Sequence, residues 1–398
     1  MEFTQQRKIR IVYVGADADD PRMITRRQFS FLTGATALAG FNAARAQGAG
    51  KIVLGQSAPF SGPAAQLGIQ FNRGANIWFD QLNAQGGVGG RSIELLKMDD
   101  GYEPDRCAAN TRKLIDEDVF ALFGYIGTPT SLAAVPLAKK EQVPFFAPFT
   151  GAMSLRDPLH KYIFHVRASY NDETELIVRQ QITLDLKKVA VFYQNDAYGK
   201  AGLDGTVLAL ASRNLKTVAQ ATVERNSVDV DAAVKTLLAA NPDAILQVSA
   251  YKSCAAFIRA ARKAGFGGTF FNVSFVGTQA LADELGRDGA GVVVSQVMPS
   301  PYNAARPITR EFAEAVKKAG GDAQANFSGM EGYLAAKVFT DGLRKVSGKI
   351  TRESLIAGLE SLGNQTYGGF NVSFSATNHV ASKFVELSML TGDGRVRT

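Results

Sequence analysis

Short runs of apolar residues alternate along the chain with longer segments in which apolar positions recur at helical spacing. Residues 51–56 and 119–124 are runs of the first kind, and residues 68–83 and 105–115 are segments of the second. A short apolar run is typical of a parallel strand that is covered on both faces, and strands that alternate with helices form β-α-β units. The first part of the chain therefore predicts a mostly parallel sheet.

The same alternation begins again at residue 188. Runs at residues 188–193 and 244–248 predict strands, and a helical segment follows each of them. Further strands are predicted at 91–98, 143–147, 221–224, 268–271, 292–296, 368–373 and 384–390, and further helices at 231–240, 309–319, 328–346 and 352–362. The second half repeats the architecture of the first without repeating its sequence. The pattern predicts an α/β protein of two similar lobes, with a cleft between their strand ends.

Residues 119–155 contain two strands, and each of them ends in a small polar turn. The first turn places Thr128 where a helix N-cap is expected and Pro129 in the first helical turn. Backbone N–H groups at a helix start lack intrahelical partners and carry the positive end of the helix dipole, so a carboxylate binds there readily. The second strand leads into residues 148–151. Two such ends side by side form the crevice in which open α/β sheets hold ligands, although two ordinary turns capped by threonine would show the same pattern.

The N-terminal segment carries an export pattern. Residues 25–32, TRRQFSFL, resemble a twin-arginine motif, and Ala44-Arg45-Ala46 matches an A-x-A cleavage site. Cleavage after Ala46 would leave residues 47–398, and we expect an exported, periplasmic protein. Acidic residues within 1–22 are unusual for a signal, so Met23 is an alternative start, and an ordinary Arg-Arg pair beside a small helix is the alternative interpretation.

Composition narrows the class of protein. The 398 residues are enough for two domains, and 46% hydrophobic with 20% charged residues is ordinary for a soluble globular protein. The formal net charge of +7 falls to +4 without residues 1–46, which contain seven basic and four acidic residues. Lysine and arginine form no block with interleaved aromatic residues, so nucleic acid is not an expected partner.

Few side chains of the sequence are suited to catalysis or to metal binding. The histidines, His160, His165 and His379, lack the spacing of zinc ligands, and Cys107 and Cys254 form no cluster. The sequence contains no nucleophile elbow and no phosphate-binding loop. We therefore expect no enzyme activity, no metal and no cofactor. The two cysteines are expected to be free, buried thiols in different lobes.

Several motifs together resemble those of one family. They are Ser61-Gly62-Pro63 followed by Gly68, NAQGGVGGR at 83–91, Asp99-Asp100, Tyr198-Gly199 and Pro242-Asp243-Ala244. This series covers essentially all of the chain after residue 46. It resembles the Leu/Ile/Val-binding proteins, which are the periplasmic solute-binding components of ABC importers.

The resemblance implies a type I periplasmic-binding-protein fold, in which a three-strand hinge joins two doubly wound parallel-sheet lobes and closes them over a ligand. Lobe 1 would contain residues 47–168 and 299–381, and lobe 2 would contain residues 169–298 and 382–398. The resemblance also implies a monomer that delivers a small-molecule ligand to the membrane permease of an ABC transporter.

The resemblance assigns ligand-binding roles to the two central turns. Thr128 takes the position of a small hydroxyl residue that binds the ligand carboxylate, and Thr130 belongs to the same turn. Phe149, Thr150 and Gly151 form the second turn, in which backbone groups bind the head of an amino acid.

Four further candidates lie outside these turns. Tyr198 and Tyr251 take aromatic positions that close over the ligand, although a loop anchor and a surface residue are the simpler interpretations. Phe275, like Phe149, would add apolar lining, but both phenylalanines fit equally well in an ordinary core. Gln66 is a weaker candidate at the rim of the cleft.

Two positions depart from the pattern of the family. Gly151 stands where the family usually has a second hydroxyl, and residues 273–275, VSF, contain no acid to neutralise a ligand ammonium. Because an unpaired buried ammonium is costly, either Asp196 or Asp283 supplies the charge or the ligand lacks an α-amino group. The expected ligand is a branched-chain or other hydrophobic amino acid, or a related hydrophobic or aromatic carboxylate or an amide. A ligand-sensing receptor or amide-binding regulator of the same fold is the alternative function.

Overall fold

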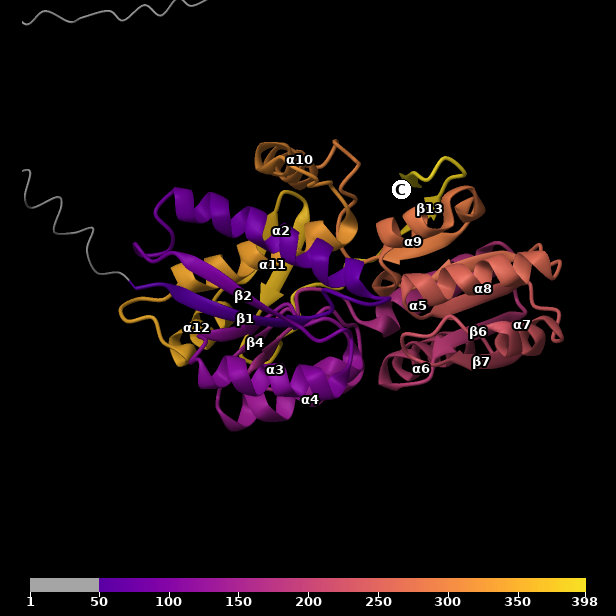
Figure 1. The fold of residues 1–398 in the computed structure, drawn as a ribbon, viewed down its shortest axis with the longest axis horizontal. Helices are drawn as coiled ribbons and strands as arrows, with labels where there is room; N and C mark the ends of the chain where they lie inside the picture. Colours follow the sequence, from indigo (N-terminus) through magenta and orange to yellow (C-terminus); the bar gives the residue numbers. More distant parts are fainter. Residues whose placement is uncertain (1–49) are drawn as a thin grey trace, which may run out of the picture. The chain divides into compact units, whose positions relative to one another are not determined.

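The computed structural model describes residues 50–398 (Figure 1). The export pattern predicted at residues 25–46 lies outside the described residues. Within the described part of the chain, the strands form two large sheets and one two-stranded hairpin, and helices flank both large sheets. The predicted α/β class is therefore confirmed.

The first sheet is parallel throughout, with the strand order β2-β1-β3-β4-β5. Its strands are β1 (Ile52–Ala58), β2 (Ile93–Asp99), β3 (Ala121–Phe123), β4 (Phe145–Phe146) and β5 (Ile163–Phe164). The connecting helices are α2 (Ala65–Ala84), α3 (Pro104–Asp116) and α4 (Thr128–Lys140). On one face α3 packs against α4, and on the other α2 packs against α11 (Phe327–Arg344), as Figure 1 shows. Both faces are thus covered, and the residues of β3 and β4 are all buried, as the apolar runs predict.

The second sheet has the order β14-β13-β10-β9-β8-β6-β7. Its parallel strands are β6 (Val189–Gln194), β7 (Ala219–Val223), β8 (Ala244–Val248), β9 (Thr269–Asn272) and β10 (Val293–Gln296). Near the C-terminus, β13 (Glu386–Leu390) and β14 (Val396–Arg397) extend this sheet in antiparallel fashion. The helices of this sheet are α5 (Tyr170–Thr183), α6 (Ala197–Ala211), α7 (Asp231–Leu238), α8 (Tyr251–Lys263) and α9 (Thr278–Leu285).

The chain passes from one sheet to the other at three points. The first lies between β5 and α5, and the second lies between β10 and α10 (Pro307–Ala319), which packs against α2. The chain then forms α11, α12 (Arg352–Glu360) and the hairpin of β11 (Gly363–Tyr367) and β12 (Phe370–Phe374). It crosses a third time before β13. This order is compatible with the predicted lobes, whose boundaries at residues 168, 298 and 381 stay a prediction.

Backbone geometry shortens the two strands predicted beside the central turns. They end at Phe123 and Phe146 because the next residues, Gly124 and Ala147, adopt positive φ angles of 64° and 52°. The prediction that Thr128 is the N-cap of α4 is wrong. Gly127 holds that position with φ +101°, and Thr128 is the first helical residue. A Cβ atom at position 127 would lie 2.3 Å from the Tyr102 ring, so only glycine fits there.

Among the strands and α-helices of residues 50–398, the apolar pattern does not predict five: β5, β11, β14, α5 and α9. The three strands are short or polar, and α9 has only eight residues. The start of α5 did carry a usable signal, because Ser169 and Asp172 form a reciprocal capping box.

Cys107 in α3 and Cys254 in α8 are both buried and free, as predicted. Burial raises the pKa of both thiols, and they belong to helices of different sheets. Among the helices of residues 50–398, none is both long enough and apolar enough to cross a bilayer.

Candidate functional site

The turns that follow β3 and β4 lie side by side, as the sequence predicts. A parallel bridge pairs Ile126 with Phe149, and the Phe149 N–H donates to the Tyr125 carbonyl over 2.7 Å. This pairing brings the Thr128 and Thr150 hydroxyl oxygens to 2.6 Å from each other, and both side chains are fully buried. Only one hydroxyl hydrogen lies between the two oxygens, so the other is free for donation to a ligand.

Thr130 and Gly151, the other residues predicted in these turns, have structural roles. The Thr130 hydroxyl donates to backbone carbonyls of its own turn, at Ile126 and Gly127, so its hydrogen is used within the protein. A Cβ atom at Gly151 would lie 2.5 Å from the backbone nitrogen of Tyr170 and equally close to the Tyr170 ring. The missing hydroxyl at position 151 is therefore explained by the close approach of Tyr170.

Phe275 lies at the centre of a group of aromatic rings that come from both sheets. Its ring centroid is 5.6 Å from that of Phe149 and 5.8 Å from that of Tyr102, which follow strands of the first sheet. It is 4.3 Å from Tyr198, which follows β6 of the second sheet, and Tyr170 lies 5.4 Å from Tyr198. These five residues, here called the aromatic cluster, are at most 1% exposed. The structure thus brings together the predicted Phe149, Tyr198 and Phe275.

The aromatic cluster contains two tyrosines that the sequence analysis does not select. Tyr102 follows Asp99-Asp100-Gly101 at the carboxyl end of β2. Its position just after a strand end is the sequence feature that could have identified it as a candidate. Tyr170 begins α5, which the apolar pattern does not predict, and the Ser169–Asp172 capping box is the sequence signal that could have placed it. Tyr198 Oη donates to the Ser249 carbonyl over 3.4 Å, which ties this ring to the end of β8.

Tyr251 and Gln66 meet at another place between the sheets. Tyr251 is the first residue of α8 and is 4% exposed. Burial raises the pKa of its hydroxyl, and a hydrogen bond with the backbone of Gln66 partly offsets this effect. The exposed Gln66 on α2 also lines a polar pocket of about 300 Å³ together with Asp283 of α9. Both predicted residues thus belong to the junction of α2 with α8 and α9.

The two acids that the sequence offers as partners for a ligand ammonium are used by the protein. Asp196 is the N-cap of α6, and its carboxylate also accepts from Gln194 Nε2 over 2.6 Å and from Arg225 over 3.2 Å. Asp283 accepts from Gln279 over 2.8 Å in the polar pocket of α2 and α9.

Sequence reasoning misses a buried ion pair beside the aromatic cluster. Arg167 donates to both carboxylate oxygens of Glu331, over 2.9 and 3.0 Å, and its guanidinium carbon lies 4.1 Å from the centroid of Phe149. Arg156 is also buried, and it donates to four backbone carbonyls, including that of Thr150. Burial, and next the charge of Arg167, lower the pKa of Arg156 to about 10.

Glu173 of α5 is a second buried acid that the sequence does not reveal. Its carboxylate accepts from the Ser274 N–H over 2.7 Å, from Ser274 Oγ over 3.0 Å and from Ser295 Oγ over 2.6 Å. Burial raises the pKa of Glu173, and the charge of Arg167 opposes this rise. Glu173 therefore fixes the short 3₁₀ turn Ser274–Val276, which carries Phe275.

Several buried polar atoms near the two turns and the aromatic cluster lack a hydrogen-bond partner within residues 50–398. They are Ser131 Oγ, Arg167 Nη1, Tyr170 Oη, Gln194 Oε1 and Ser249 Oγ. The Tyr170 hydroxyl approaches Thr150, and burial raises its pKa to about 12. Because buried polar atoms nearly always have partners, these five atoms could serve as hydrogen-bond partners of a polar ligand group.

Ionic and amide contacts join the two sheets beside the aromatic cluster. Arg225, which follows β7, pairs with Glu103 over 3.0 Å. Asn226 donates to the Gly101 carbonyl over 3.0 Å and to Glu103 over 2.8 Å. We call these four residues the latch.

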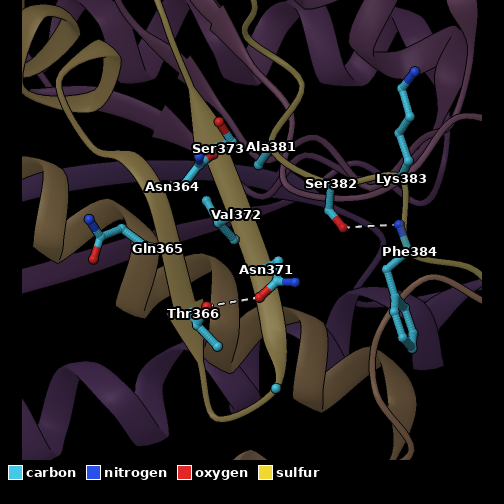
Figure 2. A pocket seen from close by; sticks show the side chains of 11 residues that line it. Asn364, Gln365, Thr366, Asn371, Val372, Ser373, Ala381, Ser382, Lys383 and Phe384 are labelled. Carbon is cyan, nitrogen blue, oxygen red and sulfur yellow. Dashed lines mark hydrogen bonds between the residues drawn. The ribbon is translucent and has the colours of Figure 1, made fainter.

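A larger pocket, of about 540 Å³, lies elsewhere, between the β11–β12 hairpin and residues 381–384 (Figure 2). Amide and hydroxyl side chains line it, and Thr366 Oγ1 donates to Asn371 Oδ1 over 2.9 Å. It shares no residue with the two central turns or the aromatic cluster, so we do not assign the ligand to it. Within the described residues, no three His, Cys, Asp or Glu side chains are placed to hold a metal ion.

Comparisons with known proteins agree with this architecture. The sequence model of the family described as periplasmic binding protein matches residues 51–393. A curated relative, the Leu/Ile/Val-binding protein homolog 7 of Brucella abortus (strain 2308), is 26% identical over 364 residues, which cover 86% of this chain and 90% of the relative.

Solved structures give the same result. A possible leucine/isoleucine/valine-binding protein from Rhodopirellula baltica SH 1 is 33% identical, with a TM-score of 0.84 over 88% of this chain and 96% of the other. A substrate-binding periplasmic protein from Ralstonia solanacearum is 31% identical, with a TM-score of 0.82 over 87% of this chain and 99% of the other.

Proposed function

The chain belongs to the family of periplasmic binding proteins, and we propose that it is the solute-binding component of an ABC importer. Its ligand is a branched-chain or other hydrophobic amino acid, or a related hydrophobic or aromatic carboxylate. The relatives named as Leu/Ile/Val-binding proteins support this ligand class. The protein works without catalysis or a cofactor, as a monomer, after export to the periplasm by the twin-arginine route.

The observation that carries the proposal is the position of Phe275. Its ring contacts Phe149 and Tyr102 from the first sheet and Tyr198 from the second. An apolar group bound beside this ring would contact both sheets at once, so binding would favour the arrangement in which the sheets approach each other.

The polar head of the ligand would lie at the start of α4. Thr128 and Thr150 offer one free hydroxyl hydrogen, and the first N–H groups of the helix have no intrahelical acceptor. The ligand head and the aromatic cluster together explain why this junction buries so many polar atoms next to aromatic rings.

A thermal-shift screen of the purified protein tests the function. The library contains hydrophobic amino acids, aromatic and aliphatic carboxylates, amides and, as negative controls, sugars and polyamines. A ligand that binds only the native state raises the melting temperature, by an amount that grows with its concentration. Shifts confined to apolar-tailed carboxyl compounds support the proposal, whereas shifts only with sugars or polyamines, or with nothing, contradict it.

A further inference from the structure

The proposed function leaves open whether the ligand carries an α-ammonium group. We propose that the site binds a carboxylate that has an apolar tail and no ammonium group. This inference rests on the proposed function and narrows its ligand class.

The carboxylates that border the aromatic cluster are already bound by donors of the protein. Asp196 accepts two helix N–H groups, one amide and one guanidinium, which fills both oxygens. Arg167 donates one hydrogen bond to each carboxylate oxygen of Glu331. Glu173 accepts three hydrogen bonds from serines, and Asp100 accepts from Ser57 Oγ and from the Tyr102 N–H. Asp196 has all four of its lone-pair sites occupied, and an ammonium group at any of the other three acids would share an oxygen that already accepts from the protein.

The start of α4, by contrast, offers groups that can donate, although Gln194 Oε1, beside Tyr102, is an unpartnered acceptor within the described residues. The Thr128–Thr150 pair has one free hydroxyl hydrogen, and the Tyr170 hydroxyl, fully buried and without a partner among residues 50–398, approaches Thr150. Ser131, in the first turn of α4, is also fully buried and has no partner in the same part of the chain. Hydroxyl groups accept as well as donate, but the helix start adds backbone N–H groups that only donate. This set matches the oxygens of a carboxylate.

The buried side chains of Arg156 and Arg167 also favour a negatively charged ligand head. Arg156 is hydrogen-bonded to backbone carbonyls around the Thr150 turn and to none of the neighbouring carboxylates. Its positive charge attracts an anionic head and repels an ammonium in surroundings where screening by water is weak. Arg167, over the ring of Phe149, adds a second positive centre, which Glu331 neutralises.

Matched pairs of compounds isolate the ammonium group. 4-Methylpentanoate differs from leucine, and 3-phenylpropanoate from phenylalanine, only by the absence of the α-ammonium. Isothermal titration calorimetry of the purified protein at pH 7 gives Kd for all four compounds, and 4-methylpentanol serves as the control that lacks the carboxylate. We expect at least one acid to bind ten-fold or more tightly than its amino acid and the alcohol not to bind measurably.

Each outcome has a distinct meaning. An amino acid that binds as tightly as its acid, or more tightly, overturns the inference and leaves the solute-binding function standing. Measurable binding of the alcohol with an affinity equal to that of the acid overturns the carboxylate assignment. Binding of none of the acids or amino acids contradicts the proposed function itself, and the inference falls with it.

Discussion

The carboxylate of Glu173 accepts a hydrogen bond from the Ser274 N–H over 2.7 Å, although the two residues are 101 positions apart. This contact fixes the turn that carries Phe275 to helix α5, which follows the first crossing between the sheets. The arrangement of the aromatic cluster therefore depends on one buried acid and on the serines around it.

Replacing Glu173 with alanine would leave the N–H and hydroxyl of Ser274 and the hydroxyl of Ser295 without their acceptor. Buried unsatisfied donors are expensive, so we expect the free energy of unfolding to fall by about 2–4 kcal/mol in urea titrations. In a double-mutant cycle, Ser295→Ala should cost less in the Glu173→Ala background than in the wild type, by roughly 1 kcal/mol. Additive effects would show that this hydrogen bond does not stabilise the turn.

Thr128→Val removes one hydroxyl of the Thr128–Thr150 pair while keeping the shape of the side chain. We expect ligand affinity to fall by about 1–3 kcal/mol, since a polar group of the ligand loses its donor, and stability to fall by about 1 kcal/mol. Calorimetry and urea titration measure the two effects separately. Thr366→Val, in the β11–β12 hairpin, is the matched control and should leave affinity unchanged. Equal affinities of the wild type and Thr128→Val would remove Thr128 from the site.

Gly151→Ala introduces a Cβ atom 2.5 Å from the backbone nitrogen of Tyr170, which cannot move without shifting α5. We expect destabilisation of about 1–3 kcal/mol and weaker ligand binding, because Tyr170 belongs to the aromatic cluster. Gly267 has open space around its Cβ position, so Gly267→Ala is the control and should change stability by less than about 0.5 kcal/mol. A stable Gly151→Ala variant with normal affinity would show that this close approach has no role.

Glu103→Gln weakens the latch without touching the aromatic cluster. If the latch favours the arrangement in which the sheets are in contact, the apparent Kd should rise roughly 2- to 5-fold, mainly through faster dissociation, and the difference should shrink at high salt. Glu175→Gln breaks the Glu175–Arg213 ion pair, which involves only the second-sheet side, and is the control. If both variants raised Kd equally, the weaker binding would result from the change in net charge and not from the latch.

Asp100 makes the stability of the protein depend on pH. Burial raises its pKa from 3.8 to about 6, against the opposing hydrogen bonds from Tyr102 and Ser57. Between these values the folded protein binds more protons than the unfolded chain, so stability falls as pH rises, by about 3 kcal/mol in total. Asparagine does not titrate, so the stability of Asp100→Asn does not show this fall with rising pH. The urea midpoint of the wild type relative to Asp100→Asn should therefore decrease from pH 4 to pH 7, and parallel curves would contradict the assignment.

The alternation of apolar runs and amphipathic segments was sufficient to predict both sheets, because parallel strands covered on two faces have a strong local signature. It could not place α5 or α9. The prediction of Thr128 as N-cap failed because the deciding contact is the Tyr102 ring, which excludes any side chain at Gly127. That contact joins segments that no local pattern relates.

The candidate site, like the fold, contains residues that local sequence patterns predict and residues that only distant contacts bring together. Thr128, Thr150 and Phe149 follow from strand ends, which sequence reasoning can find. Arg167 and Glu331 are 164 positions apart, and their burial is tolerable only because they pair. A sequence shows each charge separately, so it assigns each of them to the surface.

Amide hydrogen exchange with and without the ligand found in the thermal-shift screen tests the central claim most directly. If the ligand lies between the strand ends of the two sheets, protection should increase at 124–131 and 147–151 of the first sheet. It should increase as well at 194–199 and 273–277 of the second. Protection confined to one sheet, or to residues 363–384 around the hairpin pocket, would contradict the account.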